Sequence, residues 1–171
     1  SDLKERSKQS RNIGSSMSMN NYVLDEPALA GLKAEIDKAL KSYVSQVYAP
    51  SSPDVELYIT QSWLNYTRPG EWHHKHTHAN SLLSGVFYVN ADEKLDKIVF
   101  INDAYKLIKI PSDKINNYNT ETWDFTARTG LLLFFPSSMV HMVDKKLESH
   151  NNTRVSLEIG RAHVWTPVTL I

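Results

Sequence analysis

Beyond Pro53 the chain consists of short apolar runs separated by turn residues, and this pattern constrains its fold most strongly. The runs are rich in Val, Ile, Tyr, Phe and Trp, as strands are. We expect strands at 55–67, 82–90, 97–101, 106–110, 122–126, 131–135, 154–159 and 163–168. About eight short strands separated by signals such as Pro69-Gly70 and Gly130 predict an antiparallel sandwich or barrel.

One amphipathic helix precedes these strands. Apolar residues recur at helical spacing opposite a charged face: Leu29, Leu32, Ile36, Leu40, Tyr43, Val44 and Val47. We expect a helix over about 26–48, with Asp25 as its N-cap and Pro27 in its first turn. Residues 1–20 are polar and aperiodic, which predicts an extended arm before a single domain at 21–171.

Composition excludes several classes of protein. The 171 residues carry 19 basic and 19 acidic side chains, and this balance argues against a nucleic-acid partner. No apolar run approaches the roughly 18 residues of a membrane span, and the N-terminus lacks a signal-peptide pattern. The absence of cysteine excludes disulfides and thiolate metal sites, and we expect a cytoplasmic protein. Exposed edges of the predicted sheets make a homodimer the expected assembly.

Histidine is the unusual component, because four of the seven histidines lie between residues 73 and 78. On a strand, alternate residues point the same way, so His74, His76 and His78 share one face and His73 points oppositely. A further ligand must come from a distant segment, and His141 follows a buried-looking strand and a turn. Imidazole ligands without thiolates suit Fe(II), Zn, Ni or Cu.

Two spacings around these histidines resemble those of the cupin superfamily. Five residues separate Gly70 from the His76-Thr-His78 motif, and five residues separate Gly130 from Pro136, which precedes His141. The cupin glutamate is absent, since positions 82 and 83 are both Leu. The resemblance is therefore to the cupin architecture more than to its metal site.

A second resemblance is more specific. Arg154 begins an apolar strand 13 residues after His141 and is followed by Ser156, an arrangement similar to the 2-oxoglutarate-binding element of iron(II)- and 2-oxoglutarate-dependent dioxygenases. A planar guanidinium suits the distal carboxylate of this cosubstrate. An uncharacterised oxygenase family of bacteria and phages resembles the chain in these runs: Ser62–Asn65, Arg68–Gly70, His76–His78, Leu83–Val89, Leu133–Ser137, His141 and Arg154–Ser156.

The resemblance implies a mainly β fold, the double-stranded β-helix or jelly roll, with the N-terminal helix packed on its sheet. It also implies roles for single residues. The implied metal ligands are His76, His78 and His141, with His78 where the superfamily usually has a carboxylate. The implied 2-oxoglutarate-binding residues are Arg154, Tyr88, Ser156 and Tyr66.

Alternatives to this ligand set remain open. His74 could bind with His76 in place of His78, or a carboxylate of Glu71 or Asp144 could complete the set.

Other aromatic and histidine residues have weaker assignments. We expect Trp72 and His74 at the substrate entrance, Trp63, Trp123 and Trp165 in the core or an interface, and His150 and His163 at the surface or an edge.

The implied activity is Fe(II)- and 2-oxoglutarate-dependent oxygenation, with hydroxylation of a small molecule or peptide and release of succinate and carbon dioxide. Two other functions fit the histidines. One is a cupin-type three-histidine metalloenzyme that does not use 2-oxoglutarate, and the other is a non-enzymatic, metal-stabilised jelly roll. The position of Arg154 distinguishes these functions, because only 2-oxoglutarate-dependent oxygenation requires the Arg154 guanidinium in the metal pocket.

Overall fold

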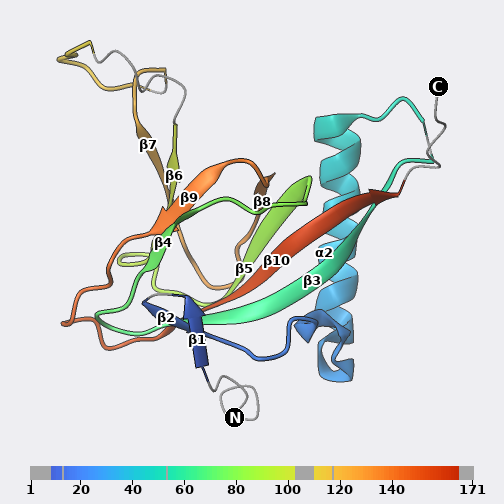
Figure 1. The fold of residues 1–171 in the computed structure, drawn as a ribbon, viewed down its shortest axis with the longest axis horizontal. Helices are drawn as coiled ribbons and strands as arrows, with labels where there is room; N and C mark the ends of the chain where they lie inside the picture. The colour runs from blue at the N-terminus through green and yellow to red at the C-terminus, as the bar shows by residue number, and fades with distance from the viewer. Residues whose placement is uncertain (1–8, 13, 53, 103–109, 117, 166–171) are drawn as a thin grey trace.

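The computed structural model describes residues 9–12, 14–52, 54–102, 110–116 and 118–165. Within these residues, ten strands form two antiparallel sheets, and one helix lies outside the larger sheet (Figure 1). The larger sheet has the strand order β1-β2-β3-β10-β5-β8, and the smaller has β4-β9-β6-β7. The predicted mainly β architecture with an N-terminal helix is confirmed.

Most of the strands lie where the sequence predicts them. The larger sheet contains β1 (Gln9–Asn12), β2 (Ser15–Met17), β3 (Glu56–Thr67), β10 (Arg154–Trp165), β5 (Leu83–Asn90) and β8 (Leu132–Pro136). The smaller sheet contains β4 (His73–His76), β9 (Val140–Val143), β6 (Lys97–Ile101) and β7 (Thr122–Thr126). Strands β1, β2, β4 and β9 are additional to the expected ranges, and the expected strand at 106–110 lies almost entirely outside the described residues.

Strand β10 corrects the prediction of two separate strands after residue 154. It pairs with β3 continuously from Arg154 opposite Thr67 to Trp165 opposite Glu56. The register shifts between Ile159 and Ala162, so a bulge near Gly160 takes the place of the expected break. Residues 166–168 of the second predicted strand lie outside the described residues.

The predicted helix is confirmed over 27–48 but consists of three helical segments. A 3₁₀ turn, η2 (Pro27–Leu29), leads into α2 (Ala30–Tyr43), which continues as a π-helical turn, η3 (Val44–Tyr48). The prediction of Asp25 as N-cap is wrong. Asp25 ends the preceding 3₁₀ turn, η1 (Val23–Asp25), and its carboxylate pairs with Lys33 at 2.7 Å. Proline at the first turn needs no N–H acceptor.

The helix covers the outer face of the larger sheet (Figure 1). Ile36 of α2 is buried in one cluster with Leu64 of β3 and with Leu157 and Ile159 of β10. Because side chains alternate along a strand, Arg154, Ser156 and Glu158 point to the other face of β10, between the sheets. The helix thus fixes which residues of β10 are available for a site.

The N-terminal segment does not stay separate from the body. Strand β2 pairs antiparallel with β3, with Ser16 opposite Tyr66, and β1 pairs with β2 at the edge of the larger sheet. The arm expected at 1–20 is therefore partly incorporated into the sheet, since edge strands offer unpaired backbone groups. Residues 1–8 and 13 lie outside the described part. No described helix is long and apolar enough to cross a membrane.

Candidate functional site

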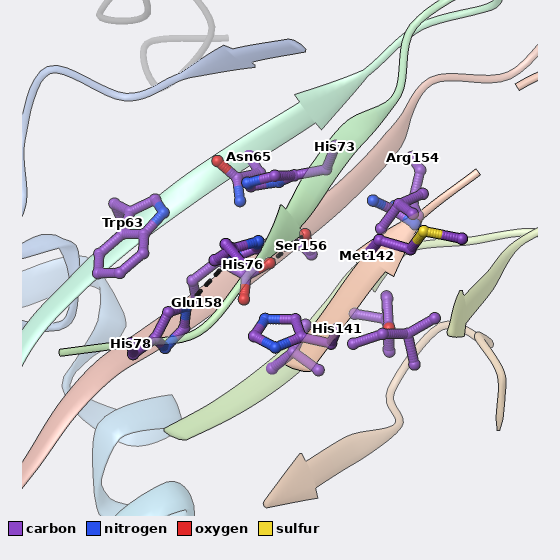
Figure 2. A pocket seen from close by; sticks show the side chains of 14 residues that line it. Trp63, Asn65, His73, His76, His78, His141, Met142, Arg154, Ser156 and Glu158 are labelled. Carbon is purple, nitrogen blue, oxygen red and sulfur yellow. Dashed lines mark hydrogen bonds between the residues drawn. The ribbon is translucent and has the colours of Figure 1, made fainter. Parts of the chain in front are cut away.

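Three histidines converge between the two sheets (Figure 2). His76 is the last residue of β4, His78 follows two residues later, and His141 lies on β9 directly opposite His76. One nitrogen from each ring lies within 4.8 Å of the other two. The Nε2 atoms of His76 and His78 are 3.2 Å apart. Two imidazole nitrogens on one metal ion lie at a similar separation, about 3 Å.

The other ring nitrogen of each histidine is held by the protein. Nδ1 of His76 is 2.8 Å from the carbonyl oxygen of His74, and Nδ1 of His141 is 3.0 Å from that of Met139. Nδ1 of His78 is 2.6 Å from Ser84 Oγ. A proton on Nδ1 that is donated to a carbonyl leaves the Nε2 lone pair of His76 and of His141 free for a metal.

Burial keeps the imidazoles of His76 and His141 neutral. It lowers the pKa of His141 to about 4, although the hydrogen bond to Met139 opposes the shift. Burial likewise lowers the pKa of His76, against the opposing hydrogen bond to His74. Because a metal competes with protons for imidazole nitrogen, neutral rings bind it readily at pH 7.

His73 corrects the expectation that it points away from the other histidines. The pairing of β4 with β9 is irregular between His73 and His76, and this bulge brings His73 to the pocket side. Its ring stacks on that of His76, with centroids 4.5 Å apart and an interplanar angle of 11°. Burial, followed by the charges of the neighbouring histidines, lowers the pKa of His73 to about 3.

A second histidine group consists of His73, His74 and His76, whose ligand nitrogens also lie within 4.8 Å of one another. Its geometry suits a metal less well. Parallel stacked rings, as in His73 and His76, direct their in-plane lone pairs side by side and not toward a common point. His74 is exposed, whereas His141 is only 4% exposed.

The two carboxylates considered as alternative ligands have other partners. Glu71 accepts a hydrogen bond from the backbone nitrogen of Arg68 at 2.7 Å. Asp144 pairs with Lys97 at 3.4 Å. Neither carboxylate lines the pocket between the sheets.

Arg154 lies in this pocket, as predicted, at the start of β10. It is 3% exposed and donates hydrogen bonds to the carbonyl of Lys97 at 3.3 Å and to Thr67 Oγ1 at 3.2 Å. Its buried Nε has no partner in the structure, and no ion pair to a carboxylate is found among the described residues. An uncompensated buried guanidinium favours binding of an anion.

Two of the other three residues expected to bind 2-oxoglutarate accompany Arg154. Ser156 and Tyr88 of β5 line the pocket and are opposite each other in the sheet. Burial raises the pKa of Tyr88. The expectation for Tyr66 is wrong in location: Tyr66 is buried with Ile36 on the helix side of the sheet, because it alternates with the pocket-facing residues of β3.

Glu158 lines the pocket although the sequence analysis did not identify it, and Trp63, which was expected in the core or an interface, lines the pocket together with Asn65. Glu158 Oε1 accepts a hydrogen bond from Ser156 Oγ at 2.9 Å (Figure 2). Burial raises the pKa of Glu158, while Ser156, the charge of Arg154 and Asn65 lower it. Arg154, Ser156 and Glu158 are spaced two residues apart on one strand, so their side chains share one face. This alternation could have identified Glu158 as a pocket residue.

Other expected residues lie outside this pocket. Trp72 and His74 line a separate surface depression that shares His73 and Met142 with the pocket. Trp123 is exposed on β7. His150 lines a pocket on the far side of Arg154, and the side chains of His163 and Trp165 lie outside the described part.

The fold and this site define a double-stranded β-helix protein with a histidine cluster and a buried arginine between its sheets. The chain belongs to the family described as "Putative 2OG-Fe(II) oxygenase", whose model matches residues 61–159. The matched segment runs from β3 to β10 and contains all three converging histidines and Arg154. A comparison with curated proteins gave no significant match.

Solved structures of 2-oxoglutarate oxygenases share the fold at low sequence identity. A Pseudomonas putida prolyl-4-hydroxylase is 15% identical, with a TM-score of 0.60, over 91% of this chain and 76% of that one. HygX from Streptomyces hygroscopicus, with nickel and 2-oxoglutarate bound, is 11% identical, with a TM-score of 0.58, over 94% and 76%. A Burkholderia pseudomallei oxidoreductase of the 2OG-Fe(II) oxygenase family is 11% identical, with a TM-score of 0.58, over 84% of this chain and only 64% of that one.

Proposed function

We propose that the protein is an Fe(II)- and 2-oxoglutarate-dependent oxygenase that hydroxylates its substrate and releases succinate and carbon dioxide. His76, His78 and His141 would hold the metal. Bound iron and cosubstrate supply the oxidising chemistry, while the protein binds, orients and excludes water.

The converging imidazoles fit a divalent metal by donor type and by spacing. The Nε2 atoms of His76 and His78 are 3.2 Å apart, one nitrogen of His141 lies within 4.8 Å of a nitrogen of each of them, and backbone carbonyls fix the orientation of His76 and His141. Three neutral histidines supply no negative charge, unlike the two-histidine, one-carboxylate set of many non-haem iron oxygenases. This set therefore leaves the full positive charge of the ion to be balanced by the bound cosubstrate.

The uncompensated guanidinium of Arg154 carries the proposal, because it distinguishes a cosubstrate pocket from a simple metal site. It lies in the same pocket as the histidines, and its Nε has no partner. The distal carboxylate of 2-oxoglutarate would satisfy this charge through paired N–H donors. Tyr88, opposite Ser156 on the same face, would add a hydroxyl donor, and Ser156 would add a second one if its hydroxyl turned from Glu158 to the cosubstrate.

The partly open cavity between the histidines and Arg154 has a volume of about 20 Å³, which is room for one ion or water molecule. Binding of 2-oxoglutarate therefore requires side chains to move. His73 is the first candidate, because it lines both this pocket and the surface depression at Trp72, and its ring stacks on that of His76.

A three-histidine metalloenzyme without a cosubstrate is the second candidate. The observation that favours it is that the converging group consists of three histidines and contains no carboxylate. This function predicts metal binding that is unaffected by 2-oxoglutarate.

Release of carbon dioxide from 1-labelled 2-oxoglutarate tests the proposal. We expect Fe(II)-dependent release by the wild type at a slow basal rate without substrate, and none by His141→Ala. Stoichiometric iron binding without any release, and without binding of 2-oxoglutarate, would favour the second candidate.

A further inference from the structure

Four residues form a compact patch on the pocket face of strands β3 and β10. Trp63 lies directly opposite Glu158, and Asn65 lies directly opposite Ser156. Directly opposed residues on neighbouring strands have Cβ atoms about 5 Å apart. All four side chains line the same pocket as the converging histidines (Figure 2).

This patch offers hydrogen-bond acceptors without an ion-paired cation. Glu158 accepts hydrogen bonds from Ser156 and Asn65 and interacts with the charge of Arg154, but no ion pair between Glu158 and a lysine or arginine is found among the described residues. Asn65 is 2% exposed, and its buried Oδ1 has no hydrogen-bond partner in the structure. A buried acceptor that stays unsatisfied costs about 1–3 kcal/mol, so a donor from a ligand would be favoured here.

Trp63 adds an aromatic surface to the two acceptors. Its indole ring is held closely over Gly160, where an added Cβ would lie 2.0 Å from Cζ3. The ring also contacts His78 edge-on, with centroids 6.1 Å apart. A fixed indole face beside a carboxylate attracts ammonium and guanidinium groups.

Charge along β10 distinguishes the two ends of the pocket. Arg154 lies four residues before Glu158, roughly 13 Å along the strand at about 3.3 Å per residue. The end at Arg154 favours an anion, and the end at Glu158 disfavours one. A ligand at the Glu158 end is therefore favoured if it is positively charged and rich in N–H donors.

We propose that Glu158, Asn65 and Trp63 form a recognition subsite for a protonated amine or guanidinium group of the substrate. This inference rests on the proposed function, because it assigns the acidic end of the pocket to substrate and the Arg154 end to 2-oxoglutarate. It names the substrate class as cationic: an amine, or a lysine or arginine side chain.

The test compares ligands that differ only in the cationic group. L-Lysine, L-arginine and cadaverine are titrated into the full-length protein loaded with Ni(II) and 2-oxoglutarate, alongside L-norleucine, L-citrulline and pentanol as neutral counterparts. Binding is followed by calorimetry. We expect at least one cationic ligand to bind tenfold or more tightly than its neutral counterpart, and equal affinities in all three pairs would overturn the proposal.

The variant Glu158→Gln keeps the size of the side chain and removes its charge. We expect it to lose the preference for the cation, whereas Asp144→Asn, the same change at a carboxylate outside the pocket, keeps it. If Glu158→Gln does not fold, Asn65→Leu tests the second acceptor with the same expected loss.

Metal affinity is measured for each variant without cosubstrate. Unchanged Ni(II) affinity in Glu158→Gln supports a substrate-binding role, and a loss of tenfold or more would assign Glu158 to the metal and overturn the inference. Failure of the wild type to bind 2-oxoglutarate would refute the proposed function instead. Binding of the cationic ligands is also measured with Ni(II) alone. This measurement tests the cation subsite even if the protein does not bind 2-oxoglutarate.

Discussion

Substitution of His141 should remove metal binding without unfolding the protein. His141→Ala removes one of three ligands, so we expect Fe(II) affinity to fall by more than about 100-fold, beyond what loss of a supporting hydrogen bond costs. Far-UV circular dichroism should be unchanged, because the substitution leaves the backbone pairing of β9 with β4 and β6 in place, although the His141 ring packs against Phe100 and Phe135 of one core cluster. Equilibrium dialysis under anaerobic conditions measures the affinity, and retained stoichiometric iron would show that His141 is not a ligand.

Matched substitutions at His74 and His78 decide between the two ligand sets. His78→Ala should weaken iron binding as strongly as His141→Ala, and His74→Ala should leave it within a few-fold of wild type. The reverse pattern would support the set that contains His74 and His76.

Arg154 should act on the cosubstrate and not on the metal. Hydrogen bonds to charged groups contribute about 1.5–3 kcal/mol each, so Arg154→Gln should weaken 2-oxoglutarate binding by about 10- to 100-fold. Ni(II) affinity should stay unchanged. Arg68→Gln is the matched control, because Arg68 is exposed beside Glu71 and lies outside the pocket. Equal losses in the two variants would contradict the role of Arg154.

The buried imidazoles predict how stability depends on pH. Folding lowers the pKa of His73 from 6.5 to about 3 and that of His141 from 6.5 to about 4. Between these values the unfolded chain binds protons that the folded protein does not, so the metal-free protein should lose stability as pH falls from about 6.5 toward 4. Urea unfolding measures this slope, and His73→Asn should reduce it. An unchanged slope would contradict the buried, neutral state of His73.

At the scale of elements, the junction of β3 and β10 depends on a residue without a side chain. Gly160→Ala places a Cβ against the ring of Trp63, and we expect a loss of about 1–3 kcal/mol in the free energy of unfolding. Gly31→Ala is the control, because Gly31 is exposed near the start of α2 and an added Cβ meets no atom within 4 Å. That change should stabilise by about 0.5–1 kcal/mol. The free energy of unfolding is measured by urea denaturation. Values equal to that of the wild type in both variants would contradict this account.

Strands with turn residues at both ends were predictable from sequence. Strands β6 and β7 have the predicted bounds, because their β-branched and aromatic runs end at clear turns. Strand β9 has only four residues, and its pairing with β4 and β6 defines it more than its own pattern does. The continuity of β10 past Gly160 likewise comes from pairing with β3.

The residues of the candidate site that belong to a sequence motif were predictable. The residues that are placed there by the pairing register of the strands were not. The His76-Thr-His78 motif, His141 and Arg154 were identified from their spacing together with the family resemblance, and the structure brings them together. The face on which His73 lies depends on a bulge in β4 that the sequence does not reveal. The pairing of Trp63 with Glu158 depends on the register of two strands about 95 residues apart in the chain.

At the scale of the whole molecule, the site requires both sheets. His76 and His141 come from the smaller sheet, whereas Arg154, Ser156 and Tyr88 come from the larger sheet. The two sheets pack through a shared cluster that includes Tyr88 and Phe100, so their separation sets the distance between metal and cosubstrate sites. An oxygenase of this kind therefore depends on an intact sandwich.

One measurement tests the metal site and the 2-oxoglutarate site together. Fe(II) is added anaerobically to the protein, and 2-oxoglutarate is then titrated while the visible spectrum is recorded. We predict a metal-to-ligand charge-transfer band that saturates at one equivalent of cosubstrate, is absent in His141→Ala and requires much more 2-oxoglutarate in Arg154→Gln. A wild-type protein that binds iron but develops no such band would contradict the central claim.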